Sequence, residues 1–118
     1  VTSVGCGESK PALSPATYKV LQEFLEEKDK AERDLRMYTN LDWTIIRPGG
    51  LKDDAPTGKA IVTEDVRASG SVNRADVAQL VIDCLASNSK ATRKEFTIVD
   101  PSLVSVDAEA PKYEAYGL

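Results

Sequence analysis

The spacing of apolar residues along the chain predicts three strands that alternate with two helices. Short runs of apolar and β-branched residues at 1–5, 43–47 and 95–99 are typical of buried strands. Two longer segments, 15–38 and 75–86, repeat apolar residues every three or four positions, which is the spacing of one helical face. The expected order is therefore strand, helix, strand, helix, strand.

Residues at the helix starts support these limits. Ser14 precedes Pro15, and serine is a preferred N-cap, while proline suits the first helical turn. Asn73 is a suitable N-cap for the second helix, and Asp76 forms an acidic variant of the capping box with it. The expected apolar stripe of the first helix comprises Leu21, Phe24, Leu25, Ala31, Leu35 and Tyr38.

This order of elements predicts an α/β fold. Two consecutive strand–helix–strand units imply parallel strands joined by right-handed crossovers. The Pro-Gly-Gly sequence at 48–50 is expected to end the second strand, and a polar loop follows over 51–58. A further short strand is expected within 59–63, and residues 101–118 are expected to form an irregular tail.

Composition excludes several classes of function. The 118 residues suit one small domain or part of one, and a net charge of −4 argues against general nucleic-acid binding. No apolar run is long enough for a membrane span. The chain has no histidine, which excludes histidine-based catalytic triads, and no metal site is expected. Cys6 and Cys84 are expected to be reduced structural residues.

Residues 41–51 read Leu-Asp-Trp-Thr-Ile-Ile-Arg-Pro-Gly-Gly-Leu and resemble a segment of the atypical short-chain dehydrogenase/reductases, the NmrA-like NAD(P)H-binding group. Three other segments resemble the same group in the same order. They are Lys-Ala-Glu at 30–32, Gly-Ser-Val-Asn-Arg-Ala-Asp-Val-Ala at 70–78, and Phe-Thr-Ile-Val at 96–99. The loop at 51–58 is most similar to the plastid branch of the group.

The resemblance implies a partial Rossmann-like fold in three layers. Residues 1–100 correspond to the C-terminal half of an NAD(P)-binding domain, so the chain is expected to begin inside a fold whose N-terminal, dinucleotide-binding half is absent. That half normally carries a glycine-rich loop whose amides approach the pyrophosphate at a helix N-terminus. Gly5-Cys6-Gly7 lacks a third glycine and does not open a helix directly, so it does not fit such a loop.

The resemblance also indicates candidate site residues. Reductases of the parent superfamily use Tyr-x-x-x-Lys on the long helix together with a serine from the preceding strand. The Lys-Ala-Glu match makes Lys30 the candidate catalytic and ribose-binding lysine, but Glu26 stands where the tyrosine would be. Ser3 is the candidate serine. The candidate cofactor-binding loop consists of Pro48, Gly49, Gly50 and Leu51.

Structural roles are open for each of these residues. Lys30 also fits a solvated lysine paired with a nearby acid, and Ser3 a hydroxyl that bonds to local backbone. The loop also fits a strand terminator with Gly50 at positive φ. Arg47 fits a structural salt bridge or an anion site.

The sequence therefore favours a non-catalytic binding or structural module docked on a larger complex, with plastids as the expected location and the cytoplasm as the alternative. The alternative is the C-terminal part of an NAD(P)H-dependent oxidoreductase. NAD(P) is the cofactor that the resemblance implies, and this chain alone is not expected to bind it. A protein partner is expected to cover the sheet edge at residues 1–5, because unpaired strands invite association.

Overall fold

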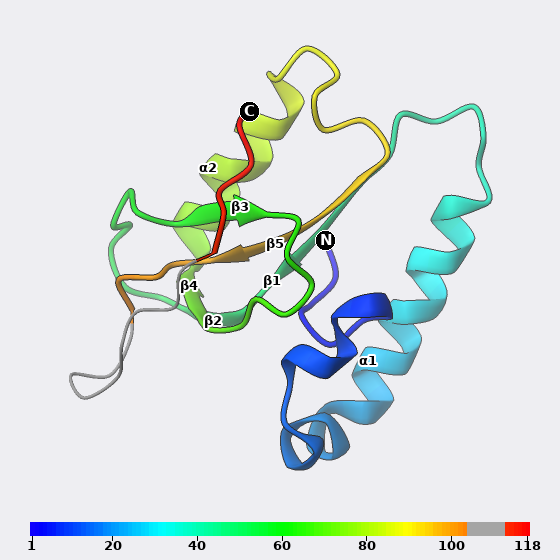
Figure 1. Cartoon of the computed structure of the whole chain (residues 1–118), viewed down its shortest axis with the longest axis vertical. Coiled ribbons are helices and arrows are strands. Elements are labelled where there is room, and N and C mark those ends of the chain that lie inside the picture. Colours follow the sequence, from blue (N-terminus) through cyan, green and yellow to red (C-terminus); the bar gives the residue numbers. More distant parts are fainter. Residues whose placement is uncertain (104–112) are drawn as a thin grey trace.

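A three-stranded sheet in the order β1-β5-β3 forms the centre of the molecule (Figure 1), a computed structural model that describes residues 1–103 and 113–118. β1 (Thr44–Pro48) pairs in parallel with β5 (Lys94–Val99). β3 (Ile61–Thr63) pairs with the other edge of β5 in the antiparallel direction. The α/β fold and the parallel pair are confirmed, and β3 makes the sheet mixed.

A second, two-stranded sheet lies where the sequence predicted only a strand terminator and a loop. β2 (Gly50–Lys52) pairs in parallel with β4 (Ser71–Asn73). The pairing needs a close backbone approach, because a Cβ on Gly49 would lie 2.2 Å from the carbonyl oxygen of Gly70. Positive φ occurs at Gly70 (145°) and not at Gly50, so the predicted conformation of Gly50 is wrong.

Residues 1–5 run beside β1 without forming the predicted regular strand. The amides of Thr2 and Val4 donate to the carbonyls of Ile46 (2.8 Å) and Pro48 (3.0 Å), which is the direction of a parallel pair. In a parallel ladder the Thr2 carbonyl would also accept a hydrogen bond from the amide of residue 48. Residue 48 is a proline, which has no N–H, so this bond cannot form and the ladder stays incomplete. The chain then turns at Val4 and Gly5.

The two helices lie on opposite sides of the central sheet (Figure 1). A short 3-10 helix, η1 (Gly7–Ala12), leads to α1 (Pro15–Arg36), and α2 (Arg74–Leu85) precedes β5. The predicted N-cap of α1 is confirmed, because Ser14 Oγ accepts from the Thr17 amide at 3.2 Å.

The predicted capping box of α2 is wrong. Asn73 occupies the N-cap position but makes no side-chain capping bond, and its amide group donates to the Ala55 carbonyl at 3.1 Å. Asp76 instead accepts from the amides of Thr57 (3.0 Å) and Gly58 (3.1 Å). Both side chains therefore bind the loop before β3, which competes with the helix for the same polar groups.

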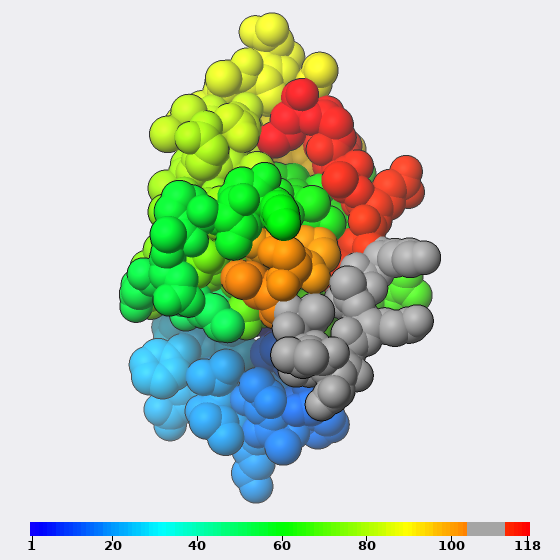
Figure 2. Space-filling view, turned by 90° about the vertical axis from the view of Figure 1, so that its left-hand side faces the viewer, coloured from blue at the N-terminus to red at the C-terminus, as the bar shows by residue number. Residues whose placement is uncertain are grey.

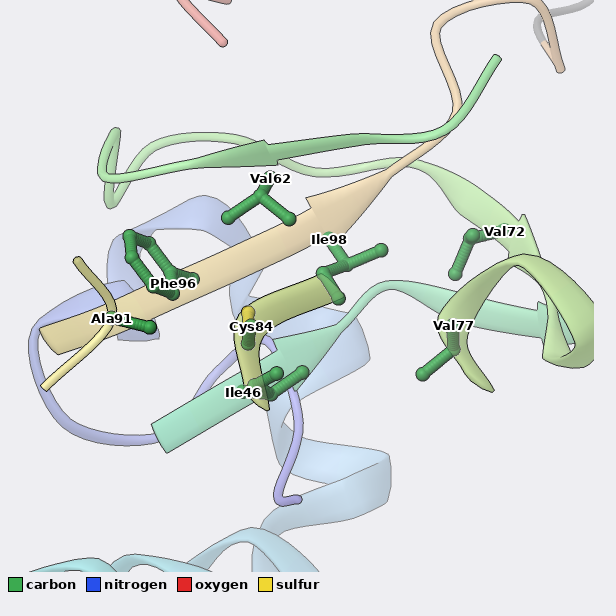
Figure 3. Close-up of a cluster of buried hydrophobic side chains, with 8 residues drawn as sticks. All are labelled: Ile46, Val62, Val72, Val77, Cys84, Ala91, Phe96 and Ile98. Carbon is green, nitrogen blue, oxygen red and sulfur yellow. The ribbon is translucent and has the colours of Figure 1, made fainter. Parts of the chain in front are cut away.

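The main apolar core fills the space between the sheet and α2 (Figure 3). Its buried members are Ile46, Val62, Val72, Val77, Cys84, Ala91, Phe96 and Ile98. Both cysteines are free and buried, as expected. Residues 113–118 form no regular element and pack against this core through Tyr116 and Leu118, whereas the rest of the predicted tail at 104–112 lies outside the described residues.

A buried ionic cluster attaches α1 to the other side of the sheet. Arg47 of β1 is 2% exposed and binds both carboxylate oxygens of Glu32 in α1, at 2.9 and 2.7 Å. It also contacts Glu95 of β5 at 2.6 Å, and Arg36 of α1 contacts the same carboxylate at 2.6 Å. Of the two roles that the sequence left open for Arg47, the structure shows the salt bridge.

Most of the predicted apolar stripe of α1 does not face this sheet. Leu25 is buried, but Phe24 is 68% exposed, and two further apolar residues, Val20 on α1 and Met37 at its C-cap, are 80% and 79% exposed. Figure 2 shows the N-terminal residues and α1 gathered at one end of the molecule. Within residues 1–103 and 113–118, no helix is both long and apolar enough to cross a membrane.

Candidate functional site

A pocket of about 270 Å³ lies where β1 ends and β2 and β4 begin. Four chain segments meet there: the N-terminal residues, the start of α1 with the residue before its N-cap, and the two loops that lead into β2 and β4. Its lining comprises Ser3, Val4, Leu13, Thr17, Leu21, Gly49, Gly50, Ser69 and Gly70. In open α/β sheets the crevice outside the carboxyl ends of parallel strands is the usual ligand site.

Backbone geometry opens this pocket. Gly49 donates to the Ile98 carbonyl at 3.0 Å, which continues the direction of β1, and Gly50 then donates to Gly70 at 2.8 Å and starts β2. A Cβ on Gly50 would meet only ordinary contacts, the nearest being Ser71 Oγ at 3.5 Å. The floor of the pocket is therefore bare backbone that a flat group can approach closely.

The lining is apolar with a few hydroxyl groups. Val4, Leu13 and Leu21 supply the apolar surface, and Ser3 and Thr17 lie among them with their hydroxyls. None of the described lining residues has a charged side chain. Small-molecule sites commonly combine such an apolar wall with a few polar groups.

The structure brings three of the six predicted site residues together, because Ser3, Gly49 and Gly50 all line the pocket. Ser3 Oγ donates to the carbonyl of Val4 at 2.9 Å, so it also has the local backbone role. Neither Pro48, which is buried, nor Leu51, which is 45% exposed on β2, lines the pocket.

Lys30 lies apart from this group. It is exposed on α1 and pairs with Glu27 at 2.9 Å, and this hydrogen bond raises the pKa of the lysine. A helix turns about 100° per residue, so Lys30 lies about 180° around α1 from the pocket residue Leu21. Its cofactor role stays a prediction, and the observed contact is the surface pairing of the structural alternative.

Lys28 lies on the other side of α1, within about 20° of Leu21 by the helical period. Lys28 is exposed, roughly 10 Å farther along α1. With Lys28 in the Tyr-x-x-x-Lys pattern, Phe24 stands at the tyrosine position, and it has no hydroxyl. Whether Lys28 or Lys30 is taken as the lysine, α1 carries no tyrosine four residues before it.

Cys6 follows the pocket residues Ser3 and Val4 in the chain but is not a candidate nucleophile. Its side chain is buried, and burial raises the pKa of the thiol. The thiol donates to the Leu25 carbonyl at 3.6 Å. Because the thiolate is the reactive form, these features make Cys6 an inert structural residue.

Comparison with known proteins connects this arrangement to one family. Residues 1–88 match the family model described as NAD(P)H-binding. An uncharacterized chloroplastic protein of Arabidopsis thaliana is 36% identical over 104 residues, which cover 85% of this chain and 34% of that protein.

Solved structures agree with this match. ChuY, an anaerobillin reductase from Escherichia coli O157:H7, superposes with a TM-score of 0.78 at 37% identity, over 89% of this chain and 50% of that one. The oxidoreductase YlbE from Lactococcus lactis has a TM-score of 0.66 at 25% identity, over 84% of this chain and 43% of that one. The chain thus spans about a third of the Arabidopsis relative and about half of ChuY. The matched residues establish that the chain belongs to the NAD(P)H-binding family, and the solved structures agree on a Rossmann-like fold.

Proposed function

We propose that this chain forms the nicotinamide- and substrate-facing part of an NAD(P)H-dependent reductase. The observation that carries the proposal is the pocket at the carboxyl end of β1, where Ser3, Gly49 and Gly50 converge. This is the position at which open α/β sheets bind ligands, and the family match supports a nicotinamide dinucleotide as that ligand.

The pocket residues fit one end of such a cofactor. The bare backbone at Gly49 and Gly50 accommodates a planar ring, and the hydroxyls of Ser3 and Thr17 offer hydrogen bonds beside it. When bound, NAD(P)H supplies a hydride. The chain's own residues orient the ring and exclude water through the apolar walls of Val4, Leu13 and Leu21.

The phosphate end of the cofactor has no matching residues in this sequence. Gly5 and Gly7 adopt positive φ, but the following Gly7–Ala12 segment is a 3-10 helix whose first amide, that of Gly7, is taken by Asp29 at 2.7 Å. A carboxylate at that place repels phosphate. In the proposed function the pyrophosphate is therefore held by residues outside this chain.

Calorimetric titration with NADPH tests this division of the cofactor site. The isolated 118-residue chain is expected to bind with a dissociation constant weaker than about 0.1 mM, because the anchoring phosphate contacts are missing. The native-length protein is expected to bind in the micromolar range, and Gly50→Leu, which fills the pocket, is expected to weaken that binding. Low-micromolar binding by the isolated chain, or unchanged binding by the Gly50→Leu variant, would contradict the proposal.

A second candidate function is a non-catalytic module docked on a partner. Two exposed features favour it: Val1 at the start of the predicted edge strand, and the apolar residues Val20 and Phe24 on α1. Hydrogen exchange distinguishes the two cases. A docked module is expected to protect the amides of residues 1–5 only in its native complex, whereas equal strong protection in a monodisperse monomer would remove the need for a partner.

Location in plastids is part of the same proposal. The Arabidopsis relative is named chloroplastic, at 36% identity. A fluorescent fusion of the native-length protein is expected to coincide with chlorophyll autofluorescence in leaf cells, and a purely cytosolic signal would contradict the assignment.

A further inference from the structure

Residues 113–118 cross β3, an edge strand of the central sheet, and reach the main core (Figure 1). The amide of Tyr116 donates to the carbonyl of Val62, the middle residue of β3, at 2.7 Å. The side chains of Tyr116 and Leu118 pack against the core, whereas Gly117 between them is exposed. The segment is thus attached through one backbone bond and two inward side chains.

Three contacts surround the side chain of Tyr116. Its hydroxyl donates to the Lys90 carbonyl at 2.8 Å. Its ring centroid lies 4.8 Å from that of Phe96 with the planes tilted by 48°, a favourable geometry for an aromatic pair. Lys94 Nζ lies 5.7 Å from the same centroid, within the range of a cation–π contact. This position suits a tyrosine better than an aliphatic residue, and better than phenylalanine, which has no hydroxyl to donate.

The segment stands away from the rest of the chain on one side. A hollow of about 450 Å³ lies between residues 114–117 and residues 63–65, which end β3 and begin the loop after it. The surface that receives Tyr116 is built by β3, by Phe96 of β5 and by the loop between α2 and β5, all outside the segment. Short peptides commonly bind in this way, through backbone bonds to a sheet edge and pockets for alternate side chains.

We propose that this surface is a docking groove for an extended peptide with a tyrosine two positions before an aliphatic residue, and that residues 113–118 are the occupant that the chain supplies itself. The proposal goes beyond the reductase function and does not depend on it. The seated segment shows the chemistry of the partner: the Val62 carbonyl holds its backbone, and Phe96, Lys94 and the Lys90 carbonyl select its tyrosine. A partner must displace the chain's own segment, which competes as a tethered ligand at an effective concentration of roughly 1 mM.

Hydrogen exchange of the wild-type chain tests whether the segment leaves the groove without unfolding of the sheet. The Tyr116 amide is expected to exchange at least about tenfold faster than the Gly49 amide, which bonds to the Ile98 carbonyl in the central sheet. Equal exchange rates would mean that the segment opens only together with the whole fold, and this result would overturn the proposal.

Peptide binding followed by fluorescence polarisation tests the recognition. The probe is fluorescein-labelled Tyr-Glu-Ala-Tyr-Gly-Leu, the sequence of residues 113–118. Tyr116→Ala frees the groove of its own tyrosine, so this variant is expected to bind the probe at least about tenfold more tightly than the wild type. Tyr116→Phe, which keeps the ring, is expected to give an intermediate affinity. Glu114→Ala changes an exposed residue of the same segment and is the matched control, expected to bind like the wild type.

Variants of the probe test the selection of tyrosine. Phenylalanine in place of the second tyrosine is expected to weaken binding to the Tyr116→Ala chain about two- to tenfold, the effect of one lost hydrogen bond. Equal binding of the original probe by the wild type and the Tyr116→Ala chain, or equal binding of a probe with alanine at that place, would overturn the proposal. Wild-type dimers that Tyr116→Ala dissociates would assign the groove to a second copy of the chain and would overturn the separate partner.

Discussion

Replacing Arg47 by methionine tests whether the buried ionic cluster determines the attachment of α1. The substitution removes three charge-assisted hydrogen bonds and leaves Glu32 without its main partner at 1% exposure. Breaking a buried pair in this way costs about 3–5 kcal/mol. Thr2 and Arg36 still donate to Glu32, at 2.6 and 3.2 Å, so the expected loss is about 3 kcal/mol, at the lower end.

Urea denaturation followed by the fluorescence of Trp43, the single tryptophan, measures this loss. Arg33→Met is the matched control, because Arg33 lies beside Glu32 on α1, is 62% exposed, and pairs with Asp29 only at 3.5 Å. That variant is expected to lose less than about 1 kcal/mol. Replacing Glu32 by leucine in the Arg47→Met variant is expected to restore part of the stability, because no unpaired charge remains. An Arg47→Met variant as stable as Arg33→Met would refute the reasoning.

Two further outcomes are expected. Gly49→Ala should lower the free energy of unfolding by about 1–3 kcal/mol, because the new methyl group would lie 2.2 Å from a backbone oxygen. Gly50→Ala, which meets only ordinary contacts, should change the free energy of unfolding by less than about 0.5 kcal/mol. Equal effects of the two substitutions would contradict the close approach of the two loops. The hydrogen bond from Arg36 holds the pKa of Glu95 below its ordinary value near 4.5, so ionised Glu95 stabilises the fold above that pH and the contribution is lost as the pH falls through the lower folded value. Glu95→Gln should therefore flatten the acid limb of a stability–pH curve relative to Glu64→Gln, and parallel curves would contradict this assignment.

The elements that the sequence predicted well are those fixed by local chemistry. The Ser14-Pro15 start of α1 and the β-branched run of β1 are visible in the chain itself, and the structure places both within two residues of the expected limits. The small β2–β4 sheet was missed because Pro-Gly-Gly was interpreted as a terminator. The two strands can pair because Gly49 has no side chain, and this requirement becomes visible only when Gly70 lies opposite Gly49 in the fold.

The apolar stripe of α1 shows a different limit of sequence reasoning. Periodicity identified an apolar face but could not name what covers it, and the side of the helix that meets the sheet is instead centred on Leu25 and Glu32. Arg47 was expected in a salt bridge, but nothing in the spacing identified Glu32 as the partner 15 residues earlier.

The sequence identified only part of the candidate site, because the rest is assembled by tertiary contacts. Ser3, Gly49 and Gly50 came from the family resemblance, which marks residues near the ends of strands. Thr17, Leu21 and the loop before β4 join the pocket only through tertiary packing.

The two-pronged bond between Arg47 and Glu32 has a consequence for the outer surface of α1. Apolar contacts alone let a helix roll or slide by a fraction of a turn, whereas a planar guanidinium that binds both carboxylate oxygens allows one rotation and one axial position. The direction in which Val20 and Phe24 point is therefore fixed within this chain. A molecule that covers them meets a helix whose orientation folding has already fixed, so binding need order only the exposed side chains and not the backbone.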